Sequence, residues 1–209
     1  MKVLYIIIFF MLLFIFIYKG DGNNSMTEPL NIAHVPKIIH HIAPYDTRRW
    51  DPKWIHNYDT WEKYYPVPEY KHILWNENTI NQLIVMKNAS LYSLFQSYKT
   101  DTYRALFAKY IILYYYGGIC ADMDIPCKAN KFNTIDLTTI NFKYDANYLN
   151  NLSINVIASP QYNDFWKLVM YFANKINGNG DKHNSVGREL INMCYMSYSD
   201  KQKIKFSIF

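Results

Sequence analysis

One stretch constrains the fold of this chain more than any other: KTDTYRALFAKYIILYYYGGICADMD, residues 99–124. It starts with a potential helix cap at Thr100 and continues with apolar residues spaced three and four apart. Gly117 and Gly118 then end the helical pattern. The short apolar segment that follows them is typical of a buried strand. The stretch therefore predicts a helix over 101–116 that reverses at the glycines into a strand over 118–124.

The two parts of this stretch have nearly equal lengths. A helix over 101–116 rises about 24 Å, and an extended chain over 117–124 covers about 26 Å. The strand thus returns Asp122 and Asp124 toward the start of the helix, where Asp101 and Arg104 lie. We expect these three carboxylates and one guanidinium to converge at the carboxyl end of the strands of a sheet.

The D-x-D pair at the end of the predicted strand has a specific chemical use. Alternate side chains of a strand point to the same side, so both carboxylates can face one ligand. Paired oxygen donors suit Mg²⁺ or Mn²⁺, which also take phosphate oxygens and water as ligands. Arg104 can pair with Asp101 or with an anionic ligand. The pattern predicts a divalent-cation site at Asp122 and Asp124.

Strand and helix patterns alternate along the rest of the chain, which favours an α/β domain. His40 and His41 fall on opposite faces of the first strand, so each is interpreted as a structural histidine with a hydrogen-bond partner. Pro52 suits the first turn of the helix that follows. Further strands are expected at 35–42, 69–75, 138–144 and 152–158, and helices at 51–66, 77–98, 161–176 and 183–196.

The N-terminus carries an apolar run, VLYIIIFFMLLFIFIY (3–18), between Lys2 and Lys19. As a helix it spans about 24 Å, which suits a signal-peptide core or a short membrane anchor. No small-residue cleavage site follows it. We expect a signal-anchor helix over 1–19, a linker over 20–34 and one α/β domain over 35–209. The chain would be a single-pass type II membrane protein with a lumenal domain of ER/Golgi type, or alternatively a secreted protein after signal cleavage.

Other features bound the environment and the partners. Asn-x-Ser sequons at Asn23, Asn88 and Asn151 agree with a lumenal glycoprotein. Three cysteines allow at most one intrachain disulfide, and without a C-x-x-C pair a zinc site is not expected. The net charge of +5 comes from scattered residues. Because they form no basic stripe, nucleic-acid binding is not expected either.

The segments PKIIHHI and KTDTYRALFAKYIILYYYGGICADMD resemble the DxD-motif glycosyltransferases of family 32, which include yeast mannosyltransferases and microbial and viral relatives. The family pattern runs roughly S-D-x-x-R-Y-x-x-L-y-x-y-G-G-i-Y-x-D-x-D, and the likeness covers about residues 36–176. The resemblance implies a GT-A fold and a UDP- or GDP-sugar donor. It also implies Mn²⁺ or Mg²⁺ as the cofactor, retention of anomeric configuration, and a glycan, lipid or protein acceptor.

Site roles follow from the resemblance by position. Asp101 and Arg104 would act in catalysis and contact the donor sugar. Asp122 would take part in catalysis, in donor binding and in holding the metal, and Asp124 would be the principal metal ligand. The chain is thus expected to be a metal-dependent hexosyltransferase. The alternative is an inactive membrane-anchored relative with a glycan-binding or structural role, which hydrolysis of a nucleotide sugar would distinguish.

The resemblance also gives donor-binding roles to residues of the first strand and of the reversal. Gly117 and Gly118 would allow the turn and close packing. The backbone around Ile39, His40 and Ile42 would line the pocket for the nucleotide base.

Overall fold

The computed structural model describes residues 33–44, 46–147, 152–178 and 186–207, and the fold is given for these ranges. They belong to a compact unit that spans Ala33–Phe209. The predicted membrane segment and the sequons at Asn23 and Asn151 lie outside the described residues. No helix within the described ranges is long and apolar enough to cross a membrane.

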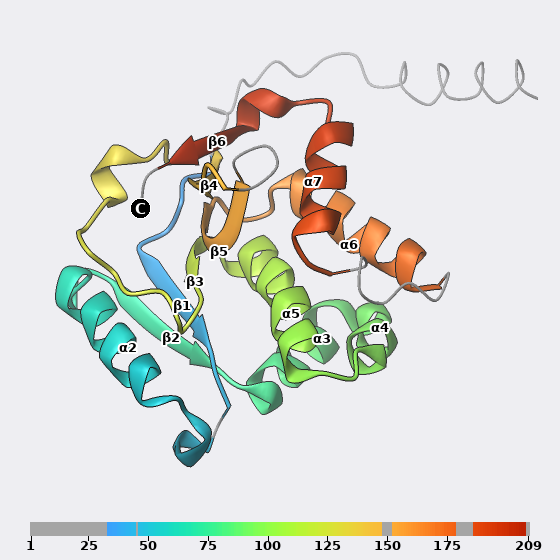
Figure 1. Ribbon diagram of the computed structural model, residues 1–209. Helices are drawn as coiled ribbons and strands as arrows, with labels where there is room; N and C mark the ends of the chain where they lie inside the picture. Colours follow the sequence, from blue (N-terminus) through green and yellow to red (C-terminus); the bar gives the residue numbers. More distant parts are fainter. Residues whose placement is uncertain (1–32, 45, 148–151, 179–185, 208–209) are drawn as a thin grey trace, which may run out of the picture. The chain divides into compact units, whose positions relative to one another are not determined.

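A six-stranded mixed sheet forms the centre of the described domain (Figure 1). Its order is β2-β1-β3-β5-β4-β6. Strand β1 is parallel to β2 and β3, β5 is antiparallel to β3 and β4, and β6 is parallel to β4. The carboxyl ends of β1, β2 and β3 therefore share one edge of the sheet. The strands are β1 (Ile38–Ile42), β2 (Lys71–Trp75), β3 (Gly118–Ala121), β4 (Ile140–Tyr144), β5 (Leu152–Ser159) and β6 (Ile204–Ser207).

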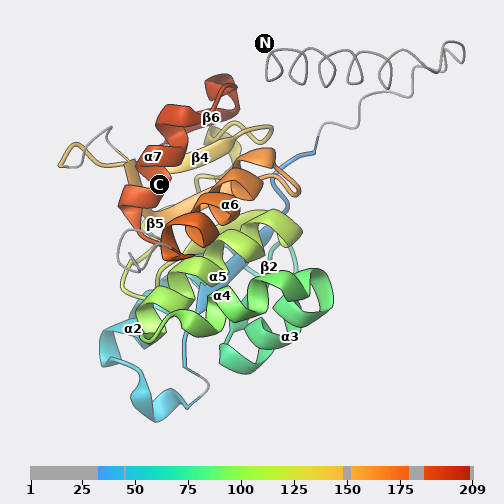
Figure 2. The same cartoon turned by 90° about the vertical axis from the view of Figure 1, so that its right-hand side faces the viewer.

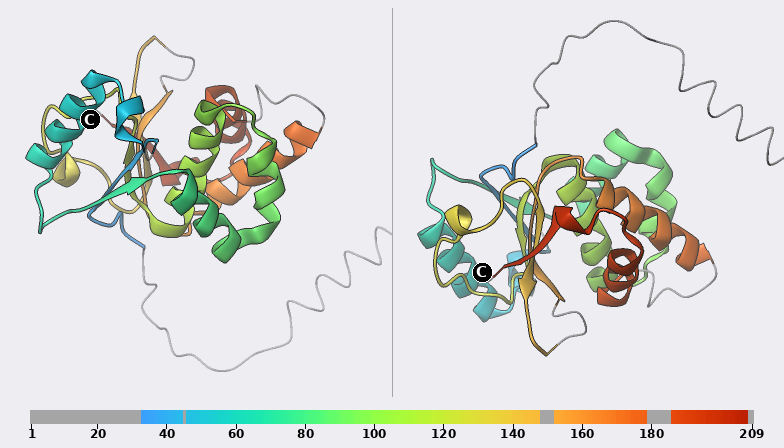
Figure 3. Two further views of the ribbon diagram at one scale, coloured as in Figure 1. Left: turned by 90° about the horizontal axis from the view of Figure 1, so that it is seen from below. Right: turned by 90° about the horizontal axis from the view of Figure 1, so that it is seen from above.

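Helices cover both faces of this sheet (Figure 3). Helix α2 (Pro52–Tyr64) and the short η3 (Phe132–Thr134) lie on one face. The other face carries α5 (Asp101–Tyr116), α6 (Asp164–Gly178) and α7 (Arg188–Ser197), with α3 (Glu77–Asn88) and α4 (Tyr92–Ser97) beside α5 (Figure 2). The remaining turns are η1 (Thr47–Arg49), η2 (Ala89–Leu91) and η5 (Lys201–Lys203). This α/β arrangement fits the expected GT-A fold.

Helix α5 and strand β3 form the helix–reversal–strand unit that the sequence predicts. The Thr100 side chain caps α5 by accepting a hydrogen bond from the Tyr103 N–H. Gly117 and Gly118 have φ angles of +62° and +86°. A Cβ atom on Gly118 would lie 2.5 Å from the Ile38 carbonyl oxygen, so the backbone conformation and the close approach of β1 both require glycine.

Helix α5 is buried on more of its surface than an amphipathic stripe predicts. Every residue from 107 to 113 is buried, because the helix lies between the sheet and other helices (Figure 2). A helix in this position is apolar nearly all round. Lys109 is the exception, with a side chain that is only 2% exposed.

Two other features differ from the sequence expectations. Strand β3 ends at Ala121, so the D-x-D pair lies just past the strand rather than inside it. Strand β6 adds to the sheet beside β4 and was not predicted, because four residues without flanking turn signals carry little pattern.

The cysteines Cys120, Cys127 and Cys194 are all buried and unpaired.

Candidate functional site

The shared carboxyl edge of the parallel strands gathers charged side chains. Asp122 and Asp124 follow β3, Arg49 lies in η1 after β1, and Glu77 begins α3 just after β2. The N-terminal end of α5 lies toward the same end of the domain as the carboxyl end of β1 (Figure 1). Ligands of open α/β sheets bind outside the carboxyl ends of strands. This edge is therefore the candidate site.

A buried lysine holds the first carboxylate of the D-x-D pair. Lys109 Nζ lies 2.5 Å from Asp122 Oδ1 and donates a second hydrogen bond, of 2.9 Å, to the Ile154 carbonyl. The Lys109 side chain is 2% exposed and that of Asp122 is 31% exposed. Burial raises the pKa of Asp122, and the charge and hydrogen bond of Lys109 oppose that rise. The lysine thus stabilises the ionised form of Asp122 and fixes one of its oxygens.

The second carboxylate, on Asp124, is exposed, and no described residue donates a hydrogen bond to it. The oxygen of Asp122 that is not bonded to Lys109 and the two oxygens of Asp124 are the groups that could hold a divalent cation. The described ranges contain no group of three or more His, Cys, Asp or Glu side chains that could hold a metal. Mg²⁺ and Mn²⁺ are usually held by one or two carboxylates together with substrate phosphates and water. The D-x-D pair fits such a shared site better than an all-protein one.

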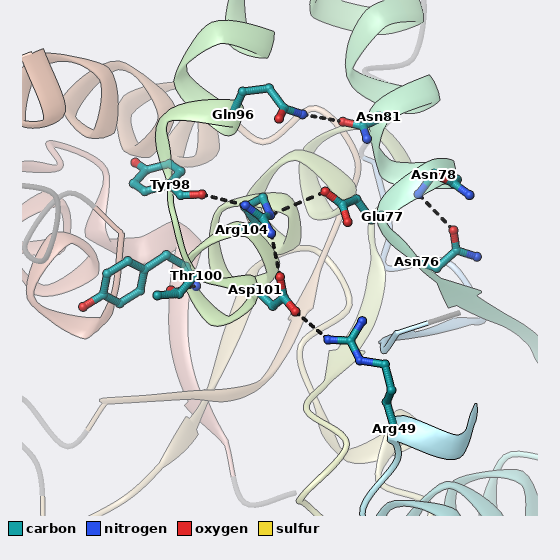
Figure 4. A network of polar contacts seen from close by, with 11 residues as sticks. Arg49, Asn76, Glu77, Asn78, Asn81, Gln96, Tyr98, Thr100, Asp101 and Arg104 are labelled. Atoms are coloured by element: carbon teal, nitrogen blue, oxygen red, sulfur yellow. Dashed lines mark hydrogen bonds and ion pairs between the residues drawn. The ribbon is translucent and has the colours of Figure 1, made fainter. Parts of the chain in front are cut away.

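Asp101 joins two arginines at the start of α5 (Figure 4). Its Oδ1 lies 2.6 Å from Arg104 Nη2, and its Oδ2 lies 3.0 Å from Arg49 Nη2. Arg104 also donates to the Tyr98 carbonyl at 2.9 Å and has its Nε 3.7 Å from Glu77 Oε1. Arg104 is 21% exposed, whereas Arg49 is 60% exposed and has Asp101 as its ion-pair partner. Arg49 thus keeps N–H donors for an anionic ligand.

The structure places the predicted site residues in two neighbouring groups rather than in one cluster. Asp122 meets α5 at Lys109, eight residues after Asp101, which is a rise of about 12 Å along the helix. Asp101 and Arg104 pair with each other as expected. The two groups are separate because β3 is short, and the D-x-D pair therefore lies beside the middle of α5.

The spacing of Asp101 and Arg104 also departs from the family pattern. In that pattern the Asp and Arg precede the first glycine by eleven and eight residues, and those positions here are Leu106 and Lys109. Asp101 and Arg104 lie five residues earlier, about 7.5 Å along the helix. Lys109 therefore stands at the arginine position of the pattern. The spacing thus weakens the roles that the resemblance gave Asp101 and Arg104 by position, and the proposal for them rests on their location at the sheet edge.

The two neighbouring histidines are structural, as the sequence indicated. His40 Nε2 donates to the Gly117 carbonyl at 2.9 Å, and its Nδ1 accepts from Trp75 Nε1 at 2.9 Å. His41 Nδ1 donates to the Ala121 carbonyl at 3.0 Å. Burial lowers the pKa of His40 to about 4 and that of His41 to about 3. Both rings are therefore neutral at pH 7, with tautomers that these hydrogen bonds assign.

Several residues expected to bind the donor lie inside the fold. Ile39 and His40 are fully buried in β1, and Gly117 and Gly118 lie at the amino end of β3, away from the carboxyl edge. Gly117 and Gly118 have the expected part in the turn and in close packing. Donor binding by these four residues stays a prediction. Ile42, the last residue of β1, is only partly buried and remains at the edge.

Lys109 and Arg49 are functional candidates that the sequence patterns did not indicate. A lysine within an apolar helix is a usable signal for Lys109, because a buried charge needs a partner. Arg49 follows another arginine in a polar turn, and nothing local distinguishes the two.

Residues 51–144 match the family described as "Glycosyltransferase sugar-binding region containing DXD motif". The class defined by this region is the DXD-motif glycosyltransferases, and this part of the chain is similar to that family. The match includes Asp101, Arg104 and both carboxylates of the D-x-D pair.

Curated relatives are similar to this chain in sequence, and a solved structure is similar to it in fold. Inositol phosphoceramide mannosyltransferase 3 of Schizosaccharomyces pombe is 29% identical over 123 residues, which are 56% of this chain and 33% of that protein. Mannosyl phosphorylinositol ceramide synthase CSH1 of Saccharomyces cerevisiae is 31% identical over 108 residues, 52% of this chain and 28% of that protein. The chain thus spans about a third of the length of these relatives. The structure titled "PaToxG Glycosyltransferase" is similar in fold, with a TM-score of 0.53 at 18% identity over 79% of this chain and 69% of that one.

Proposed function

We propose that this protein is a retaining glycosyltransferase of GT-A fold that moves a hexose from a nucleotide-diphosphate sugar to an acceptor and depends on Mn²⁺ or Mg²⁺. One observation carries the proposal: the D-x-D carboxylates lie at the carboxyl edge of three parallel strands, with Asp122 fixed by Lys109 and Asp124 exposed. The match of residues 51–144 to the DXD-motif family supports it.

The charged residues of the candidate site, apart from Glu77, each have a part in this proposal. Asp124 and the available oxygen of Asp122 would hold the divalent cation, which when bound neutralises charge on the diphosphate leaving group. Lys109 keeps Asp122 ionised and oriented. Arg49 donates N–H groups to the diphosphate, since a guanidinium suits phosphate oxygens. Asp101 and Arg104 bind donor-sugar hydroxyls beside it.

The names of the relatives support a choice of the first donor and acceptor to test. Two of these are named as enzymes of mannosyl inositol phosphoceramide formation. We therefore propose GDP-mannose or UDP-mannose as the first donors to test, and a phosphoinositol lipid as the first acceptor, ahead of glycans and proteins. The apolar segment 3–18 would hold the domain at the lumenal side of a membrane, where such a lipid can reach it.

The test is a panel of GDP- and UDP-sugars with the full chain in detergent, Mn²⁺ and a phosphoinositol lipid. The measurements are release of the nucleoside diphosphate and the anomeric configuration of the product by NMR. We expect one donor to react and its configuration to be retained. If no donor reacts under these conditions, the transferase assignment fails, and the inactive glycan-binding relative becomes the better description.

A further inference from the structure

The D-x-D segment leaves the sheet immediately after β3. Its last link to a neighbouring strand is the Asp122 N–H, which donates to the Asn155 carbonyl at 2.9 Å. The chain then turns, with the Ile125 N–H donating to the Asp122 carbonyl at 3.1 Å. The position of Asp124 consequently depends on what holds the main chain of this turn.

Helix α2 supplies the contacts that hold the turn. Asn57 Nδ2 donates to the Met123 carbonyl at 3.0 Å, and Trp61 Nε1 donates to the Ile125 carbonyl at 2.8 Å. Thr60 Oγ1, between them on the helix, accepts from the Cys127 N–H at 2.8 Å. These three side chains have the i, i+3, i+4 spacing of one helix face.

The hydrogen bond from Asn57 reaches the residue that lies between the two aspartates in the chain. The Met123 carbonyl belongs to the peptide group that joins Met123 to Asp124, so the amide of Asn57 sets the plane from which Asp124 projects. Asn57 is buried at 8% exposure, and Met123 is buried at 4%. The Asp124 carboxylate itself accepts no hydrogen bond from a described residue, so its backbone is what orients it.

We propose that Asn57 is a positioning residue for the cation site at the D-x-D pair. The proposal rests on the proposed function in one respect, namely that the pair binds a divalent cation. Without the Asn57 amide, the Met123 carbonyl would be buried without a donor, and the turn would shift to find water or another partner. Residues that do not touch the metal but hydrogen-bond to its ligands orient those ligands. Removing such a residue typically weakens metal binding by about 10- to 100-fold.

The experiment compares Asn57→Leu with Asn141→Leu in the full chain. Asn141 is a matched control, because it is also a buried amide and donates to main-chain carbonyls, at 2.7 Å to Asp136 and 3.0 Å to Thr139, on β4 away from the site. Mn²⁺ affinity in the presence of GDP or UDP is measured by the EPR signal of free Mn²⁺. Amide hydrogen exchange is measured on a peptide that covers 121–127.

We expect Asn57→Leu to bind Mn²⁺ at least about 10-fold more weakly and to exchange the amides of 122–125 and 127 faster. Asn141→Leu should lower the melting temperature without either effect. Wild-type Mn²⁺ affinity and wild-type exchange in folded Asn57→Leu would overturn the proposal. If that variant does not fold, Asn57→Ser, which is too short to reach the Met123 carbonyl, is judged by the same two measurements.

Failure of the proposed function gives a different result. If the wild-type chain binds no Mn²⁺ with either nucleotide, the cation site fails, and with it the role of Asn57 toward a metal. Amide exchange would then still decide whether Asn57 holds the turn.

Discussion

Lys109 and Asp122 form an ion pair between α5 and the end of β3, with Nζ 2.5 Å from Oδ1. The lysine is almost fully buried and the aspartate is partly exposed, so the pair lies at the boundary between the core and the candidate site. One side of the pair thus belongs to the fold and the other to the site.

Replacing Lys109 by methionine should lower the free energy of unfolding by about 2 kcal/mol. This is less than the ~3–5 kcal/mol for removing one partner of a fully buried pair, because Asp122 remains partly in water. Urea denaturation at pH 7 measures the change. The double variant Lys109→Met, Asp122→Asn removes the unpaired charge and should recover part of the loss. A double variant that is less stable than the single one would show that the pair is not the source of the effect.

Asp124→Asn should weaken Mn²⁺ binding by at least about 10-fold, because a charged ligand becomes a neutral one, and transfer activity should be lost with it. The melting temperature should not change, since the side chain is exposed. Asp59→Asn, which changes another exposed aspartate, on α2, is the control and should behave like the wild type. Full turnover in excess EDTA would show that no cation is needed.

Arg49→Ala should weaken the binding of a nucleoside diphosphate by roughly 10-fold or more, the value of a hydrogen bond to a charged group. Calorimetric titration measures it. Arg48→Ala is a close control, because Arg48 pairs with Asp46 within its own turn and not with Asp101. Equal losses in both variants would indicate a general charge effect rather than a contact by Arg49.

Asp101→Asn should distinguish the binding of the donor sugar from the binding of the diphosphate. We expect weaker binding of the intact nucleotide sugar and nearly normal binding of the free diphosphate, because Asp101 is proposed to contact sugar hydroxyls. The same titrations measure both ligands. Equal weakening of the two would assign Asp101 to holding Arg49 in place instead.

Acid should destabilise the domain through its buried histidines. The pKa of His40 is about 4 in the folded chain, below the ordinary value of 6.5, so the unfolded chain binds more protons between these pH values. Its contribution to stability is complete above pH 6.5 and falls as the pH drops, by about 2 kcal/mol between pH 6.5 and 5. Unfolding curves over this range measure the slope. His40→Gln should have a shallower slope, and an unchanged slope would contradict the assignment.

The local features of this chain could be predicted from the sequence. The Thr100 cap, the reversal at Gly117 and Gly118, and most helices and strands depend on side-chain and backbone preferences that act within a few residues. The D-x-D pair was recognisable for the same reason, because its two aspartates are only one residue apart in the sequence.

The partners of these residues were decided by the tertiary structure. Lys109 meets Asp122 across 13 residues, Arg49 meets Asp101 across 52, and Asn57 meets Met123 across 66. Such pairs form only after packing fixes which face of α5 is buried, which helix covers β3, and where β3 ends. The sequence by itself therefore determined that a carboxylate pair follows a glycine reversal. Only the packed fold decided which carboxylate is neutralised, which is exposed, and which amide orients the turn between them, since these depend on contacts that no local preference encodes.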